Sequence, residues 1–273
     1  MFKRVFAVFF SGTGTTEKTV KAIANIIADE LCLKYEEWNF TPLFARQNHM
    51  TFNNDDIVVF GTPVIAGRVP NLLLDYLDTI EGNGALAIPV VMYGNRNFDD
   101  GLIELRDILL KSGMKTIAAA ACVGEHSFSR VLGQGRPDKK DMSEIFIFAN
   151  KIARKIKEGK VSQKVDVDGE PFPYRGYYQP RDRYENPIDI RKVKPKTNEN
   201  CDDCKLCAEL CPLGSINFDD VSKIDGICMK CCACIKKCPK GAKYFDDEGY
   251  LYHQHELEEQ YQRRGENKFY LED

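Results

Sequence analysis

The residues best suited to chemistry are cysteines, which recur in two similar runs between Cys201 and Pro239. The first run reads CDDCKLCAELCP and the second CMKCCACIKKCP, so each has the form C-x2-C-x2-C-x3-C-P. Three thiolates from one tight loop suit three irons of a cubane cluster, with the fourth ligand coming from elsewhere. Paired C-x2-C motifs also bind zinc, but zinc does not explain the third cysteine or the proline after the fourth. The spacing therefore predicts iron–sulfur clusters, with zinc and then disulfides as the alternatives.

The two runs resemble those of bacterial two-cluster ferredoxins, in which the fourth cysteine of each run binds the other run's cluster. Cys232 lies next to a ligand position and is interpreted as a bystander thiol. The resemblance implies two [4Fe–4S] clusters, one bound by Cys201, Cys204, Cys207 and Cys238 and the other by Cys228, Cys231, Cys234 and Cys211.

A second candidate site is the loop that follows the first apolar run. Its hydroxyls and backbone N–H groups, at the start of a predicted helix, suit a phosphate. The loop lacks the G-K-[ST] of a Walker A motif, and Glu17 stands where G-x-G-x-x-G needs its third glycine. It contains no Lys or Arg, so neutral donors would bind the phosphate. Its residues are Ser11, Gly12, Thr13, Gly14, Thr15 and Thr16.

The pattern S-x-T-G-x-T after a first strand resembles the FMN-phosphate loop of flavodoxins, and the resemblance extends over residues 1–160. In that family the flavin ring lies between the loops after the third and fourth strands. The resemblance implies that Tyr93 stacks on the ring; the other face would meet Val64, Ile65 or backbone, because the Trp of many flavodoxins is missing here. The FMN contacts implied in the two loops are Thr62, Pro63, Val64, Ile65, Ala66 and Gly67, then Tyr93, Gly94, Asn95, Asn97 and Phe98.

The elements that must position these residues alternate between strands and helices. Apolar runs predict strands at 3–9, 33–38, 56–60, 86–92 and 116–122, and one-sided apolar spacing predicts helices at 16–30, 70–80, 99–112 and 140–158. Such alternation favours an α/β parallel sheet with helices on both faces, and ligands then bind beyond the carboxyl ends of the strands. The flavodoxin resemblance implies five strands in the order 2-1-3-4-5. A third loop on this edge, 124–130, contains His126, a weak catalytic candidate beside Glu125.

The remaining chain divides into three parts. Residues 161–195 contain prolines and many aromatic residues, which predicts an extended strap lying on one domain or both; its local basic charge suits an acidic redox partner. Residues 196–250 form the ferredoxin-like domain, a small α+β unit. Residues 251–273 form a tail with a polar helix, in which His253 and His255 are expected to face solvent.

Composition limits the classes of function. A length of 273 residues fits about two domains, and a net charge of −3 offers no case for binding nucleic acid or an anionic membrane. No apolar run approaches the roughly 18–20 residues of a membrane-spanning helix, and the start resembles a signal peptide only faintly. Nine of the eleven cysteines fall within 201–238, and thiolate clusters need a reducing compartment, so we expect a cytoplasmic protein.

The chain as a whole resembles flavodoxin–ferredoxin fusion proteins of anaerobic microbes. That resemblance implies an electron-transfer protein that relays electrons between two [4Fe–4S] clusters and FMN, with redox proteins as partners and a homodimer as an open option. Two other functions stay open at this point. The chain could be a flavin-dependent reductase whose substrate enters near Tyr93, Phe98 and His126, or a redox or oxygen sensor acting through a partner protein.

Overall fold

The larger part of the chain is an α/β unit built on a mostly parallel sheet. The computed structural model describes residues 2–272. The main strands lie in the order β2-β1-β3-β4-β6, which is the doubly wound order 2-1-3-4-5 with β6 in the fifth place. The predicted α/β class of this unit and its strand order are therefore confirmed. The bounds are β1 Arg4–Phe9, β2 Lys34–Asn39, β3 Asp56–Pro63, β4 Leu86–Tyr93 and β6 Ala119–Val123.

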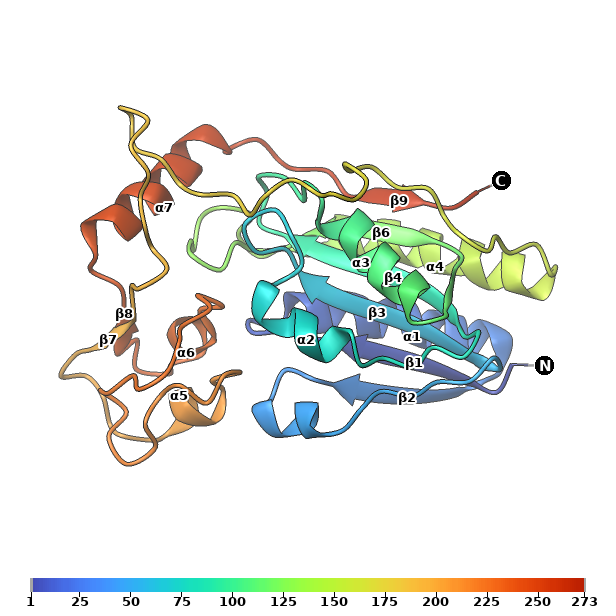
Figure 1. The fold of residues 1–273 in the computed structure, drawn as a ribbon, viewed down its shortest axis with the longest axis horizontal. Coiled ribbons are helices and arrows are strands. Elements are labelled where there is room, and N and C mark those ends of the chain that lie inside the picture. The colour runs from blue at the N-terminus through green and yellow to red at the C-terminus, as the bar shows by residue number, and fades with distance from the viewer. Residues whose placement is uncertain (1, 273) are drawn as a thin grey trace.

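Helices cover both faces of this sheet (Figure 1). α1 (Thr15–Leu31) packs beside α4 (Lys139–Lys157) on one face, while α2 (Leu74–Leu77) and α3 (Gly101–Lys111) cover the other. Strand side chains alternate between the two cores, so that Val5 and Ala7 belong to the core on the side of α1, while Phe6 and Val8 belong to the core on the side of α2 and α3. Both faces of the sheet are buried, which explains why its strands read as continuous apolar runs.

Two predicted elements differ from the structure. The helix expected at 70–80 is a 3₁₀ turn, Asn71–Leu73, followed by the short α2. It ends early because the backbone of Glu81 pairs with Met50 and Phe52, which draws the chain out of helical geometry. The strand expected at 116–122 is split into β5 (Lys115–Thr116), which pairs with β4, and β6. A further 3₁₀ helix, Leu43–Gln47, follows β2.

The C-terminal tail adds a strand to the main sheet, so the expectation of five strands is wrong. After α7 (Glu248–Gln260) the chain returns to the sheet, where β9 (Lys268–Tyr270) pairs antiparallel with β6. β9 covers the backbone groups that β6 would otherwise leave unpaired at the edge. The prediction that His253 faces solvent is also wrong, because the residue is 5% exposed and its ring lies 5.9 Å from that of Tyr178.

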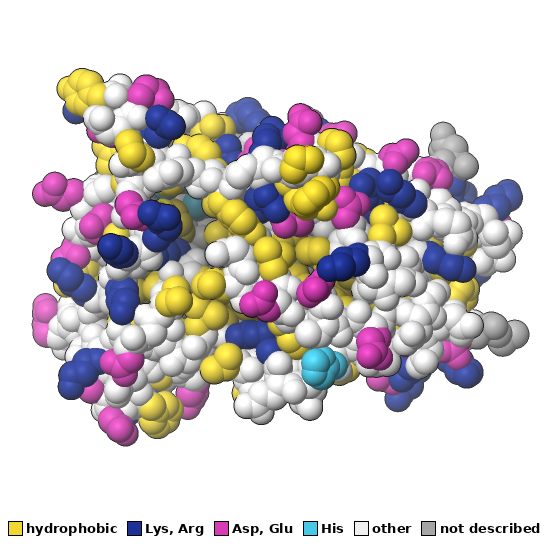
Figure 2. All heavy atoms as spheres, viewed as in Figure 1, with side chains coloured by type: hydrophobic (Ala, Val, Ile, Leu, Met, Phe, Trp, Pro, Cys, Tyr) yellow, Lys and Arg dark blue, Asp and Glu magenta, His cyan; other side chains and the backbone are white. Residues whose placement is uncertain are grey.

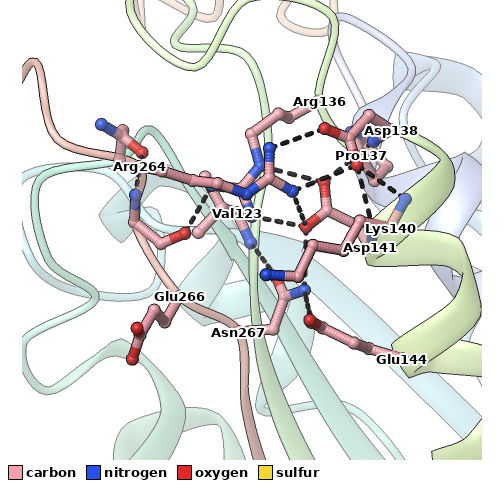
Figure 3. A network of polar contacts seen from close by, with 12 residues as sticks. Val123, Arg136, Pro137, Asp138, Lys140, Asp141, Glu144, Arg264, Glu266 and Asn267 are labelled. Atoms are coloured by element: carbon pink, nitrogen blue, oxygen red, sulfur yellow. Dashed lines mark hydrogen bonds and ion pairs between the residues drawn. The ribbon is translucent and has the colours of Figure 1, made fainter.

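A polar network fastens this tail to the start of α4 (Figure 3). At its centre is Asp141, which is fully buried and accepts hydrogen bonds from Arg136, Arg264 and Asn267. Arg136 also donates to the carbonyl oxygen of Gly265 at 2.6 Å, and Asn267 accepts from the N–H of Val123 at 2.9 Å. The network therefore joins the tail, α4 and the end of β6.

The cysteine-rich segment forms a separate small unit beyond the carboxyl ends of the main strands (Figure 1). It contains two short helices, α5 (Leu206–Glu209) and α6 (Ala233–Lys236), and a two-stranded antiparallel sheet of β7 (Lys196–Thr197) and β8 (Lys243–Tyr244). Figure 2 shows acidic and basic side chains intermixed over one face of the molecule, with hydrophobic side chains gathered mostly near its centre. Among residues 2–272, no helix combines the length and the apolar character that crossing a membrane requires.

Candidate functional site

Two cavities in the small unit collect the cysteines of both runs. The first cavity contains the fourth cysteine of the second run, and the second cavity contains the fourth cysteine of the first run. Cys234 borders both cavities, and Cys232 borders the second. The predicted ligand sets are thus brought together as Cys201, Cys204, Cys207 and Cys238 around the first cavity, and Cys211, Cys228, Cys231 and Cys234 around the second.

The two runs adopt the same backbone conformation at equivalent positions. In the first run Asp203 and Lys205 have φ of 54° and 63°; in the second Lys230 and Cys232 have φ of 58° and 57°. This left-handed region costs a residue with a side chain about 1–2 kcal/mol, so a repeated occurrence marks loops that must curl tightly. The first three cysteines of each run border one cavity. Cys232 occupies the position of Lys205, so its place in the loop is set by backbone shape and not by a need for a thiol.

The fourth cysteines of the two runs, Cys211 and Cys238, accept equivalent hydrogen bonds. The Sγ of Cys211 accepts the N–H of Ser215, and the Sγ of Cys238 accepts the N–H of Ala242, each at 3.3 Å. Such N–H groups stabilise thiolate charge in iron–sulfur sites. Within residues 2–272, no three His, Cys, Asp or Glu side chains are grouped closely enough to hold a single metal ion.

A third cleft lies at the carboxyl ends of β1, β3, β4 and β6. Part of the predicted FMN site lines it, together with Met92, residues 124–127 and one cysteine of the second run. The residues from the predicted set are Gly12, Thr13, Thr15, Thr16, Pro63, Val64, Ile65, Tyr93 and Gly94, and the additional ones are Met92, Gly124, Glu125, His126, Ser127 and Cys231.

The loop after β1 is shaped around Ser11. Its hydroxyl oxygen accepts the N–H groups of Gly14 and Glu17 at 3.2 and 3.1 Å, which leaves its own proton free to be donated. Gly14, with φ of 103°, precedes α1, whose first N–H groups have no partner within the helix. Thr13, Thr15 and Thr16, which each carry a hydroxyl, border the same space. These donors and the positive end of α1 fit a phosphate.

The other predicted FMN residues do not line this cleft. Thr62 is fully buried and its hydroxyl has no hydrogen-bond partner among the described residues. Asn95 holds the tail instead, because its side chain bonds the carbonyl oxygens of Tyr261 and Arg263 and the N–H of Gly265. The predicted FMN residues that are not part of the lining are Ser11, Gly14, Thr62, Ala66, Gly67, Asn95, Asn97 and Phe98.

Tyr93 is held firmly at the edge of the cleft. Its hydroxyl donates to the carbonyl oxygen of Glu266 at 2.6 Å, and its ring lies 5.6 Å from that of Phe98. The tail therefore sets the position of the aromatic residue that was predicted to stack on a flavin. No sequence signal linked Tyr93 to the tail, since the contact spans more than a hundred residues.

His126 is a neutral residue in the cleft wall. Burial lowers its pKa to about 3, and the nearby positive charges of Lys236 and Arg96 act in the same direction. Its Nδ1 accepts the N–H of Phe128 at 3.1 Å, which leaves the proton of the neutral ring on Nε2. Its ring also lies against Gly94, where a Cβ atom would approach Cδ2 to 2.1 Å.

Glu125 is ionised and paired. Burial would raise its pKa, but the Lys236 ammonium at 2.5 Å and the N–H of Gly135 lower it below its ordinary value. The predicted pair of Glu125 and His126 is thus a fixed carboxylate next to a neutral imidazole.

The aromatic strap lies on the loop that follows β3. The N–H of Tyr178 donates to the carbonyl oxygen of Ala66, and the hydroxyl of Tyr177 to that of Val69, both at 2.8 Å. Arg175 reaches the fully buried carboxylate of Asp100 at 2.6 Å. Burial would raise the pKa of Asp100, but this guanidinium and two backbone N–H groups lower it. These contacts hold one wall of the cleft in place.

Comparison with known proteins gives structural similarity only. No protein-family model and no curated protein match the chain. A flavodoxin from the domain Archaea is 16% identical, with 56% of this chain and 99% of that chain covered and a TM-score of 0.41. A Fusobacterium nucleatum flavodoxin mutant bound to flavin mononucleotide is 15% identical (57% and 98% covered, TM-score 0.39), and a flavone reductase 11% identical (59% and 65%, TM-score 0.43). At these values the fold class rests on the strand order and helix placement described above.

Proposed function

We propose that this chain is an electron-transfer protein that binds FMN in the cleft of its α/β unit and two [4Fe–4S] clusters in its cysteine-rich unit. The observation that supports the proposal is that the eight predicted ligands border two cavities, and that the fourth cysteine of each run lies at the cavity of the other run. Cys234 reaches both cavities, and Cys232 borders the second in addition. The exchange of the fourth cysteines is the arrangement that two cubane clusters with crossed ligands require.

The surroundings of the cavities fit clusters. Leu206, Leu210 and Val221 border the first, and Ile216, Ile224 and Phe245 border the second, so both are shielded by apolar side chains. The N–H groups of Ser215 and Ala242 compensate part of the thiolate charge. Apolar shielding and hydrogen bonds to sulfur are the features by which a protein tunes the potential of such clusters.

The cleft fits FMN in its donor chemistry. The phosphate would be held by the start of α1 and by Thr13, Thr15 and Thr16, without a cationic side chain. The ring would lie between Val64 and Ile65 on one side and Tyr93 on the other, at the carboxyl ends of the strands where doubly wound sheets bind ligands. Bound there, FMN supplies one- and two-electron chemistry, whereas each cluster supplies one electron at a time.

Anaerobic purification tests the proposal through metal and flavin content. We expect about eight irons and one FMN per chain, following from two four-iron clusters and one flavin. Cys211→Ala should lose iron while keeping FMN, and the double change of Thr13 and Thr16 to Ala should weaken FMN binding while keeping iron. A protein that contains zinc and no flavin would refute the proposal, and equal loss of both cofactors in either variant would contradict separate sites.

A flavin-dependent reductase is the second candidate, because the neutral ring of His126 lines the cleft and carries its proton on Nε2. Rapid oxidation of the reduced protein by one small molecule, abolished in His126→Ala with FMN content unchanged, would favour it. Electron transfer is expected instead to give slow oxidation by small molecules and rapid exchange with a redox protein.

A further inference from the structure

The second cysteine run touches the loop that follows β1. A Cβ atom on Gly12 would lie 3.0 Å from the Cβ of Cys231 and 3.4 Å from its Sγ. Real Cβ atoms rarely approach other atoms so closely, so the glycine permits this contact. The φ of Gly12 is not in the left-handed region, and the close approach is therefore the reason for glycine at this position. Cys231 also lines the cleft itself.

Neighbours of the other second-cavity ligands hold the two units together. The carbonyl oxygen of Pro212, which follows Cys211, accepts a hydrogen bond from Arg46. Lys236 forms an ion pair with Glu125 at 2.5 Å and donates to the carbonyl oxygen of Ser129. Met229 is buried in the core shared with α2 and α3. The loops that surround the second cavity are therefore packed against the α/β unit.

The first cavity lies away from this junction. All of the residues that line it belong to the range 201–243, and within the described chain none comes from the α/β unit. Cys204 is exposed. The nearby side chains of Lys240 and Asp202 are about half exposed. A redox protein could therefore approach this cavity from solvent.

We propose that the two cysteine sites have fixed and different positions in the molecule: the site of Cys228, Cys231, Cys234 and Cys211 is the one at the flavin cleft, and the site of Cys201, Cys204, Cys207 and Cys238 faces outward toward a one-electron redox protein. This inference rests on the proposed function, since it assigns an order to the sites named there. Gly12 and Cys231 are the point at which a predicted ligand of the second site touches the loop at the start of the cleft.

A change at Gly12 tests the order without measuring turnover. Electron paramagnetic resonance of the reduced protein separates two clusters, and Cys201→Ser and Cys228→Ser identify which signal belongs to which site. Gly12→Ala places a methyl group against Cys231, so we expect it to shift the g-values and midpoint potential of the signal lost in Cys228→Ser and to leave the other signal unchanged. Gly176→Ala is the matched control, because an added Cβ there meets no atom within 4 Å.

A second pair of variants applies if Gly12→Ala folds poorly. Lys236→Met removes the ion pair to Glu125, whereas Lys240→Met removes an exposed lysine beside the first cavity. We expect Lys236→Met to alter the signal that is lost in Cys228→Ser, and Lys240→Met to leave that signal as it is. A change confined to the signal lost in Cys201→Ser, or no change in any signal, would overturn the inference. Absence of two iron–sulfur signals in the unaltered protein would instead refute the proposed function.

Discussion

Replacing Asp141 by Asn should release the C-terminal tail from the main sheet. The carboxylate is fully buried and accepts five hydrogen bonds: two from Arg136, one each from Arg264 and Asn267, and one from the N–H of Asp138 (Figure 3). An amide has one oxygen, and its NH₂ group would face donors. The change also leaves the buried guanidinium of Arg136 without its counter-ion.

The size of the effect follows from these contacts. Removing one partner of a buried ion pair costs about 3–5 kcal/mol. Since every 1.4 kcal/mol is a factor of ten, opening of the tail should become roughly 100 to 4,000 times more frequent. Hydrogen exchange of the β9 amides, Lys268–Tyr270, reports this opening, with the amides of β1 as an internal reference.

Asp138→Asn is the control for Asp141→Asn. Asp138 belongs to the same network, but its side chain is 39% exposed and Asn is equally good as the N-cap of α4. We expect its β9 exchange to stay within about fivefold of that of the unaltered protein. If Asp141→Asn also leaves β9 exchange unchanged, the network does not hold the tail.

Three further predictions concern the strap, the tail and the extra cysteine. Arg175→Ala removes the guanidinium from Asp100, which keeps two backbone donors, so the attachment of the strap should weaken by about 1–2 kcal/mol. A protease specific for aromatic residues should then cut the strap roughly 5 to 30 times faster, and Arg183→Ala is the control. The pKa of Asp141 is lower in the folded chain, although burial opposes this, because Arg136 bonds the ionised form. Folding therefore gains stability from this group above the unfolded pKa of about 3.9 and loses it as pH falls, so β9 protection should decline below about pH 4. Cys232→Ala should keep the full iron content, since its Sγ bonds the carbonyl oxygen of Lys230 at 3.4 Å; loss of four irons would make it a ligand.

The sequence predicted the elements whose signals are local. Apolar runs identified each main strand to within a few residues, and the one-sided spacing of Val20, Ile23 and Ile27 identified α1. Cysteine spacing identified the eight candidate ligands that border the two cavities, while the exchange of the fourth cysteines was implied only by the ferredoxin resemblance. These features depend on neighbours within one run or one helix.

The features that were missed depend on contacts between distant parts of the chain. β9 is three residues long and becomes a strand because β6 offers it an open edge. His253 looks polar in sequence but is buried against Phe128 and Tyr178 when α7 docks. Asn95 was assigned to the flavin and instead bonds the tail, and the approach of Cys231 to Gly12 has no counterpart in either local pattern.

The cysteine-rich unit is joined to the α/β unit at both of its ends. On one side the strap leaves the sheet near Val165, which is buried, and runs over the β3 loop; on the other side the tail returns to β6 through β9. A domain on a single linker samples many orientations, whereas one anchored at two separated points loses most of that freedom. The relative orientation of the two units is therefore fixed when the chain folds. This orientation should be independent of protein concentration. Cutting either the strap or the tail should let the units reorient while both stay folded.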